Sequence, residues 1–114
     1  MSSPKKAPTK EDFQEALRNI DSFTLSYHKS GIKIHINDGI IESIRVIKTA
    51  IKSLLFMNEQ DINWVSSTIS HVKRLNAERA IDFDGKDEEV RSLLTEISLA
   101  IRDYRNQFRP ILMD

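Results

Sequence analysis

Cysteine is absent from this 114-residue sequence, which excludes a disulfide framework, a zinc–thiolate site and a cysteine nucleophile. Glycine and proline number only three each, and so few turn-forming residues favour long helices over a turn-rich β-sandwich. An excess of charge is also missing, because seventeen basic residues balance seventeen acidic ones. This balance argues against a uniformly basic nucleic-acid-binding protein.

A long uninterrupted apolar run is lacking as well. The densest apolar segment, residues 40–57, contains Glu42, Arg45, Lys48 and Lys52, whereas a membrane-spanning helix needs about 20 mostly apolar residues. The first ten residues lack the apolar core of a signal peptide. We therefore expect no membrane partner and an intracellular location, which is cytoplasmic or, in a eukaryotic cell, nuclear.

The residues that are present fit one globular domain. Apolar residues make up 39% of the chain and charged residues 30%, which is ordinary for a folded domain and unlike a disordered chain. We predict an all-α fold: an antiparallel bundle of about four helices, with a short extended segment near residues 32–36 between the first two helices. The bundle domain covers residues 10–110, after a flexible basic arm (residues 1–9) and before a C-terminal tail (residues 111–114).

The first two helices are predicted from apolar residues that recur at three- and four-residue spacing. The first begins after Thr9, which can cap it together with Asp12 three residues later, and it stops near Gly31. The second covers residues 40–57 and has little polar surface. A helix this apolar is either central in its fold or covered by a second chain.

Two further helices follow with the same spacing. The third begins at a cap at Asn58 or Asp61, and an acidic link, residues 81–85, follows it. The fourth ends at about Arg109, because Pro110 lacks the backbone N–H that a helix needs.

The segment before the second helix has a strand-like pattern. Ile32, Ile34 and Ile36 alternate with polar residues, and no other part of the chain reads as a convincing strand. A lone strand leaves its backbone groups unpaired. Three interpretations therefore stay open: an edge strand that pairs with another copy or a partner, an extended linker packed on the bundle, or an early turn of the next helix, since Ile32, Ile36 and Ile40 are four residues apart.

Sequence motifs of catalysis and of metal binding are absent. The sequence has no glycine-rich phosphate loop, no H-E-x-x-H and no G-x-S-x-G motif. The three histidines lie at no short metal-ligand spacing on a helix. The acidic link fails as a calcium loop, because Asp82 and Asp84 would be followed by Lys86 at the third ligand position. We expect no enzymatic activity, no cofactor and no bound metal.

The leading functional hypothesis is a non-enzymatic protein–protein interaction or scaffold module that acts through helix-face packing. Its partner is another protein or a second copy of itself, in a homodimer formed through the helix of residues 40–57 or the strand of residues 32–36. The candidate contact residues are apolar side chains of the extended segment or off the main helical seams, together with a tryptophan, a residue that interfaces favour: Ile32, Ile34, Ile36, Val46, Phe56 and Trp64.

The alternative hypothesis is a nucleic-acid-associated accessory protein. The tetrad at residues 3–6, Ser-Pro-Lys-Lys, resembles a repeat of some histone tails that binds the DNA minor groove. Three arginines share one face of the fourth helix, where cations near a C-terminus also complement the helix dipole. The candidate contacts with an anion or a nucleic acid are the basic residues of the arm and of this face: Lys5, Lys6, Lys10, Arg102, Arg105 and Arg109.

Overall fold

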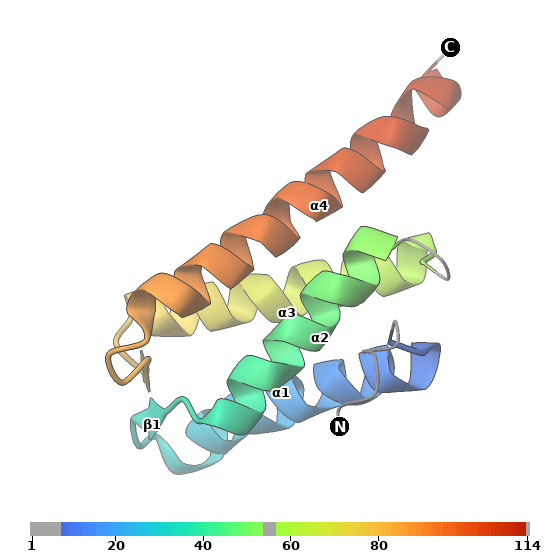
Figure 1. The fold of residues 1–114 in the computed structure, drawn as a ribbon. Helices are drawn as coiled ribbons and strands as arrows, with labels where there is room; N and C mark the ends of the chain where they lie inside the picture. The colour runs from blue at the N-terminus through green and yellow to red at the C-terminus, as the bar shows by residue number, and fades with distance from the viewer. Residues whose placement is uncertain (1–7, 54–56, 114) are drawn as a thin grey trace.

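The computed structural model describes residues 8–53 and 57–113, with side chains up to residue 107. It contains four helices and two very short strands (Figure 1), which confirms the predicted all-α bundle. In chain order the elements are α1 (Lys10–Ser30), β1 (Ile34–His35), α2 (Asp38–Ser53), α3 (Glu59–Ala77), β2 (Ile81–Asp82) and α4 (Asp87–Met113).

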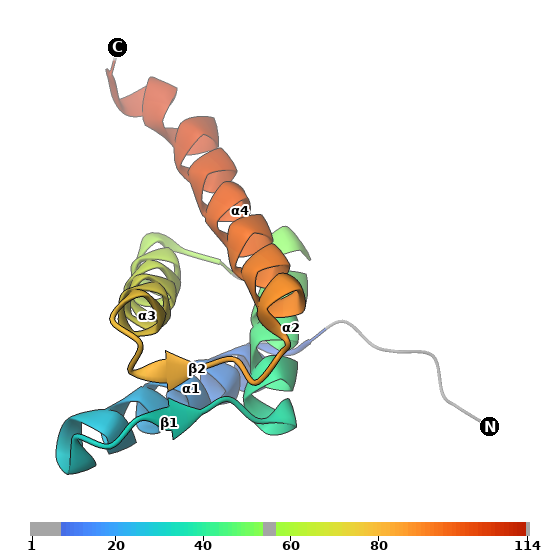
Figure 2. The ribbon, with the colours of Figure 1, turned by 90° about the vertical axis from the view of Figure 1, so that its left-hand side faces the viewer.

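The four helices form two helical hairpins placed side by side. The first hairpin is α1–β1–α2 and the second is α3–β2–α4, and the two helices of each hairpin run in opposite directions (Figure 1). Helices α1 and α4 each pack against both α2 and α3, so the order around the bundle is α1, α2, α4, α3. Figure 2 shows that both strands lie at the same end of the bundle.

The two hairpins are joined by a parallel bridge between their connections. Ile34 pairs with Ile81 and His35 pairs with Asp82, and the N–H of Ile36 donates to the carbonyl of Asp82 at 2.8 Å. Residues 34–35 of the extended segment are therefore a strand, and the N–H groups of Ile34 and Ile36 find their partners within the chain. The expectation that no other segment forms a strand is wrong. The acidic link supplies the partner, because two residues are too few to show the alternation by which strands are recognised.

The hydrophobic core lies between the hairpins, and α2 supplies its centre. Ile44, Ile47 and Ile51 are fully buried. The apolar face of α2 is thus covered within one chain by α1 and α4, without a second chain. The acidic link also enters the core, since Ile81 and Phe83 are 1% and 2% exposed.

The helix starts follow their predicted caps closely. The Thr9 hydroxyl accepts the N–H of Asp12, the Asp12 carboxylate accepts the N–H of Thr9, and α1 ends at Gly31 with a φ of 70°. Asn58 caps α3, as one of the two predicted residues. Helix α2 begins two residues earlier than predicted, because the side chain of Asn37 accepts an N–H of its first turn.

The C-terminal end of α4 differs from its prediction. The helix does not end at Arg109 but continues through Pro110 to Met113. A proline inside a helix removes one backbone hydrogen bond, here the bond to the carbonyl of Asn106. Asn106 is exposed, so water can satisfy that carbonyl and the helix continues.

Candidate functional site

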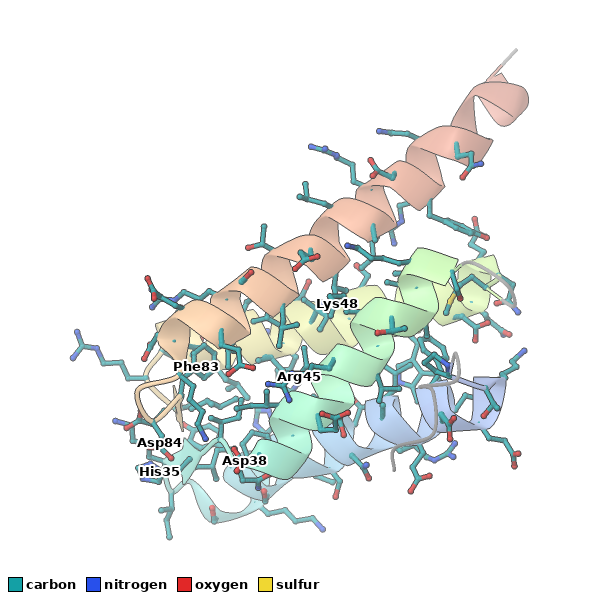
Figure 3. The ribbon with its side chains drawn as sticks, viewed as in Figure 1. His35, Asp38, Arg45, Lys48, Phe83 and Asp84 are labelled. Carbon is teal, nitrogen blue, oxygen red and sulfur yellow. The ribbon has the colours of Figure 1, made fainter. Side chains whose placement is uncertain are left out.

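The basic face of α2 is turned toward α4 and is neutralised there. Arg45 pairs with Glu89, and Lys52 Nζ lies 2.8 Å from Glu96 Oε1, with Lys48 Nζ 4.0 Å from the same carboxylate. Arg45 and Lys48 are labelled on this side of α2 in Figure 3. The hydrogen bond from Lys52, together with the nearby charge of Lys48, holds the pKa of Glu96 below its usual value. These two lysines and this arginine therefore form ion pairs within the chain.

A groove of about 390 Å³ opens between α2 and α4 next to this ion pair. Its apolar lining comes from Ile51 on α2 and from Leu99, Ala100 and Tyr104 on α4. Leu99 is 44% exposed, so the groove contains accessible apolar surface. The polar residues of the groove are Lys52, Glu96, Asp103 and Gln107.

Helix α4 continues well past this groove. Ile101 is its last described residue in the hydrophobic core, and the twelve residues 102–113 extend the helix by about 18 Å. We call residues 102–113 the α4 extension. Figures 1 and 2 show it projecting away from the other three helices. Its sequence continues the apolar seam of α4 through Tyr104 and Phe108.

The opposite side of α4 carries a groove of different chemistry. It has a volume of about 280 Å³, lies between α3 and α4, and is lined by Arg102, Arg105 and several serines. A neighbouring hollow on α3 shares two of these serines and adds His71 and Arg74. No carboxylate lines either hollow, and no ion pair joins Arg74, Arg102 or Arg105 to another described residue. We call this surface the serine–arginine groove, and its shared serines are Ser66 and Ser70.

The predicted contact residues of the extended segment lie in three different environments. Ile32 is 68% exposed, Ile34 is partly buried against the core, and Ile36 is only 4% exposed. The side chain of Ile36 is therefore unavailable to a partner of the folded chain. Ile32 alone keeps a fully accessible apolar surface here.

The other predicted contact residues are mostly engaged inside the bundle. Val46 is partly buried against the core, and Phe56 lies outside the described residues. Trp64 is also partly buried, and its Nε1–H donates to Asp21 Oδ2 at 2.9 Å. The Thr68 hydroxyl donates to the other oxygen of that carboxylate at 3.0 Å. The indole of Trp64 thus has a polar partner on α1.

The predicted anion contacts are only partly brought together. Arg102 and Arg105 share the serine–arginine groove, whereas Lys10 lies elsewhere, with its Nζ 4.0 Å from Asp61 Oδ2. The residues at positions 5, 6 and 109, namely Lys5, Lys6 and the side chain of Arg109, lie outside the described part of the chain.

Sequence reasoning missed the contribution of α3 to this groove. Ser66, Ser70 and Arg74 recur every four residues, which places them on one helix face. That spacing was a usable signal, but it did not reveal that the face lies beside the arginines of α4.

One cluster could hold a metal ion. His35 on β1 lies next to Asp82 and Asp84 of the second connection, and one donor atom from each of the three residues falls within 4.8 Å of the others. Figure 3 labels His35 and Asp84 at the bridge end of the bundle. The cluster escaped sequence analysis because His35 and Asp84 are 49 positions apart.

Comparison with known proteins gave no relative: no family model, no curated protein and no solved structure matches this chain. Among the described residues, no helix combines the length and the apolar character needed to cross a membrane.

Proposed function

We propose that this chain is a non-enzymatic interaction module of the cytoplasm that pairs with a second copy of itself through α4. The observation that carries the proposal is the α4 extension, which continues the helix about 18 Å beyond Ile101, with Tyr104 still packed against the edge of the core. The first half of the extension forms part of the wall of the groove between α2 and α4, in which Leu99 is exposed. In the proposed dimer the α4 extension of each copy packs into that groove of the other.

The stability of helices supports packing of the α4 extension against a partner. An isolated helix shorter than about 12–15 residues is marginally stable in water, and most helical stability comes from packing of an apolar face. A second copy offers an identical seam, and a two-fold interface is the commonest way to bury such a surface. A helix laid into an apolar groove is also a recurrent recognition mode.

Charge supports the same pairing. The α4 extension carries Arg102, Arg105 and Arg109 against a single acidic residue, Asp103. The groove presents the carboxylate of Asp103, beside the ion pair of Lys52 and Glu96. Attraction between the arginines of an entering helix and Asp103 would help to orient that helix and raise its association rate.

Chemical cross-linking tests where the two copies meet. The chain has no cysteine, so Gln107→Cys places a unique thiol at the groove. A bismaleimide should link this variant into dimers. Leu25→Cys is the matched control, because Leu25 is 48% exposed on α1, away from α4, and the bismaleimide should not link this variant. Equal linking at both positions, or none at position 107, would count against the α4 surface.

A second candidate function is binding of nucleic acid along the serine–arginine groove. Arginine and serine side chains are common contacts for phosphate groups, and Arg74, Arg102 and Arg105 face no carboxylate in this groove. Filter binding with single-stranded RNA and duplex DNA should detect retention that falls steeply with salt.

Two double variants that each remove two positive charges test this candidate. Arg102→Gln/Arg105→Gln should abolish retention, while Arg18→Gln/Arg91→Gln, which alters two arginines outside the groove, should preserve it. Retention that is the same in both double variants, or absent from the unaltered chain, would dismiss this candidate.

A further inference from the structure

Three donor atoms converge where the two hairpins are bridged. His35 Nδ1 lies 2.8 Å from Asp84 Oδ1 and 3.7 Å from Asp82 Oδ2. The parallel register places His35 directly opposite Asp82. One nitrogen and two oxygens, from two connections far apart in sequence, therefore surround a single point.

The backbone around these donors is well anchored. Phe83 is buried in the core between Asp82 and Asp84, so the two aspartates on either side of it turn outward. Asp82 Oδ1 accepts the N–H of Asp84 at 2.8 Å, which leaves Oδ2 toward His35. Main-chain hydrogen bonds between β1 and β2 fix the backbone of His35 relative to that of Asp82.

The charges of the cluster favour a divalent cation. Two carboxylates face one imidazole, and Lys33 Nζ lies 4.0 Å from Asp82 Oδ2. Lys86, which interacts electrostatically with Asp84, forms its ion pair with Asp38 instead. A divalent ion would neutralise both carboxylates at once. The side chains are 40–59% exposed, so an ion reaches them directly from solvent.

The donor types narrow the choice of ion. Calcium and magnesium prefer oxygen donors alone, whereas imidazole together with carboxylates suits zinc and similar divalent transition metals. Ligand atoms lie about 2.0–2.2 Å from zinc, so donors separated by about 3–4 Å fit around one ion. We propose that His35, Asp82 and Asp84 bind a divalent transition-metal ion of the zinc class, with water in the remaining positions, and that this ion fastens the two hairpins together.

A pair of histidines elsewhere in the chain provides an internal control for the proposed metal site. His28 Nε2 and His71 Nε2 lie 2.8 Å apart between α1 and α3, so they are a second place where two metal-ligating atoms approach each other. That pair has no carboxylate in the third position. If a change of His71 removed metal binding, the ion would be bound by the histidine pair and not by His35, Asp82 and Asp84.

Calorimetric titration of the full chain with zinc chloride tests the site. The unaltered chain should bind one equivalent, and His35→Asn and Asp84→Asn should each weaken binding by about tenfold or more. Asparagine tolerates the left-handed backbone of Asp84, whose φ is 53°, so that variant keeps the local fold. His71→Asn should bind as the unaltered chain does.

A second measurement needs no variant. Zinc should shift backbone amide resonances of residues 34–36 and 82–85 and raise the melting temperature, because only the folded chain brings the three donors together. The proposal is overturned if the unaltered chain binds no zinc at millimolar concentration, if His35→Asn binds normally, if His71→Asn removes binding, if calcium binds more tightly than zinc, or if the shifted resonances lie elsewhere.

Discussion

His28 Nε2 and His71 Nε2 lie 2.8 Å apart and join α1 to α3, with the two rings stacked at 4.9 Å between centroids and 15° between planes. A hydrogen bond between two imidazole nitrogens needs one proton between them, so one ring donates and the other accepts. When both rings are protonated, both nitrogens are donors and the contact becomes repulsive. The two hairpins thus share a contact that depends on pH.

We predict that acid weakens the fold through His71. Burial lowers the pKa of His71, and the charges of Arg74 and His28 lower it further, against the opposite effect of Asp21. The unfolded chain therefore takes up this proton at a higher pH than the folded chain. The free energy of unfolding should fall as pH drops through about 6.5, the ordinary histidine value, and the loss is complete below the pKa of the folded state.

Urea denaturation of the unaltered chain and of His71→Gln, from neutral pH to about pH 5, measures this effect. The variant should lose less free energy of unfolding than the unaltered chain over that range. Two parallel pH profiles would show that the histidine pair does not couple the hairpins to pH.

A second prediction concerns the Asp21 carboxylate, which receives hydrogen bonds from Trp64 and Thr68 across the α1–α3 contact. Asp21→Ala leaves both donors without their partner and should lower the free energy of unfolding by about 1–3 kcal/mol. Glu15→Ala, on an exposed part of the same helix, should change it by less than about 0.5 kcal/mol. Urea denaturation compares the two, and equal effects would mean that the network contributes nothing.

A third prediction separates the two ends of the extended segment. Ile36→Ala empties a core position and should cost about 2–5 kcal/mol of unfolding free energy, whereas Ile32→Ala, at 68% exposure, should cost less than about 0.5 kcal/mol. Chemical denaturation of both variants checks this. Similar losses would contradict the burial of Ile36 beneath the bridge.

Local signals in the sequence were enough for the helices. The Thr9–Asp12 capping box and Gly31 define α1 at both ends through contacts between near neighbours in the chain. The apolar stripe of α2 likewise predicts that this face of the helix is buried, because an apolar stripe must face a core. The start of α2 was placed two residues late, and the end of α4 was placed too early, because Pro110 was given more weight than a solvent-exposed helix end requires.

Contacts between distant residues could not be predicted in the same way. The pairing of Ile34 with Ile81 depends on how the two hairpins pack, and neither two-residue strand has a recognisable period. The same packing brings Ser66 and Ser70 beside Arg102. The arginine could be picked out from its helix face, but its neighbours could not.

Sedimentation equilibrium of the unaltered chain beside Leu99→Asp tests self-association through α4 most directly. Over a concentration series reaching about tens of micromolar, the unaltered chain should approach twice the monomer mass, since such a dimer buries the exposed leucine. Leu99→Asp places a charge in that groove and should remain monomeric, while Leu25→Asp should behave as the unaltered chain. A monomer mass for the unaltered chain at every concentration, or an undisturbed dimer in Leu99→Asp, would contradict pairing through this surface.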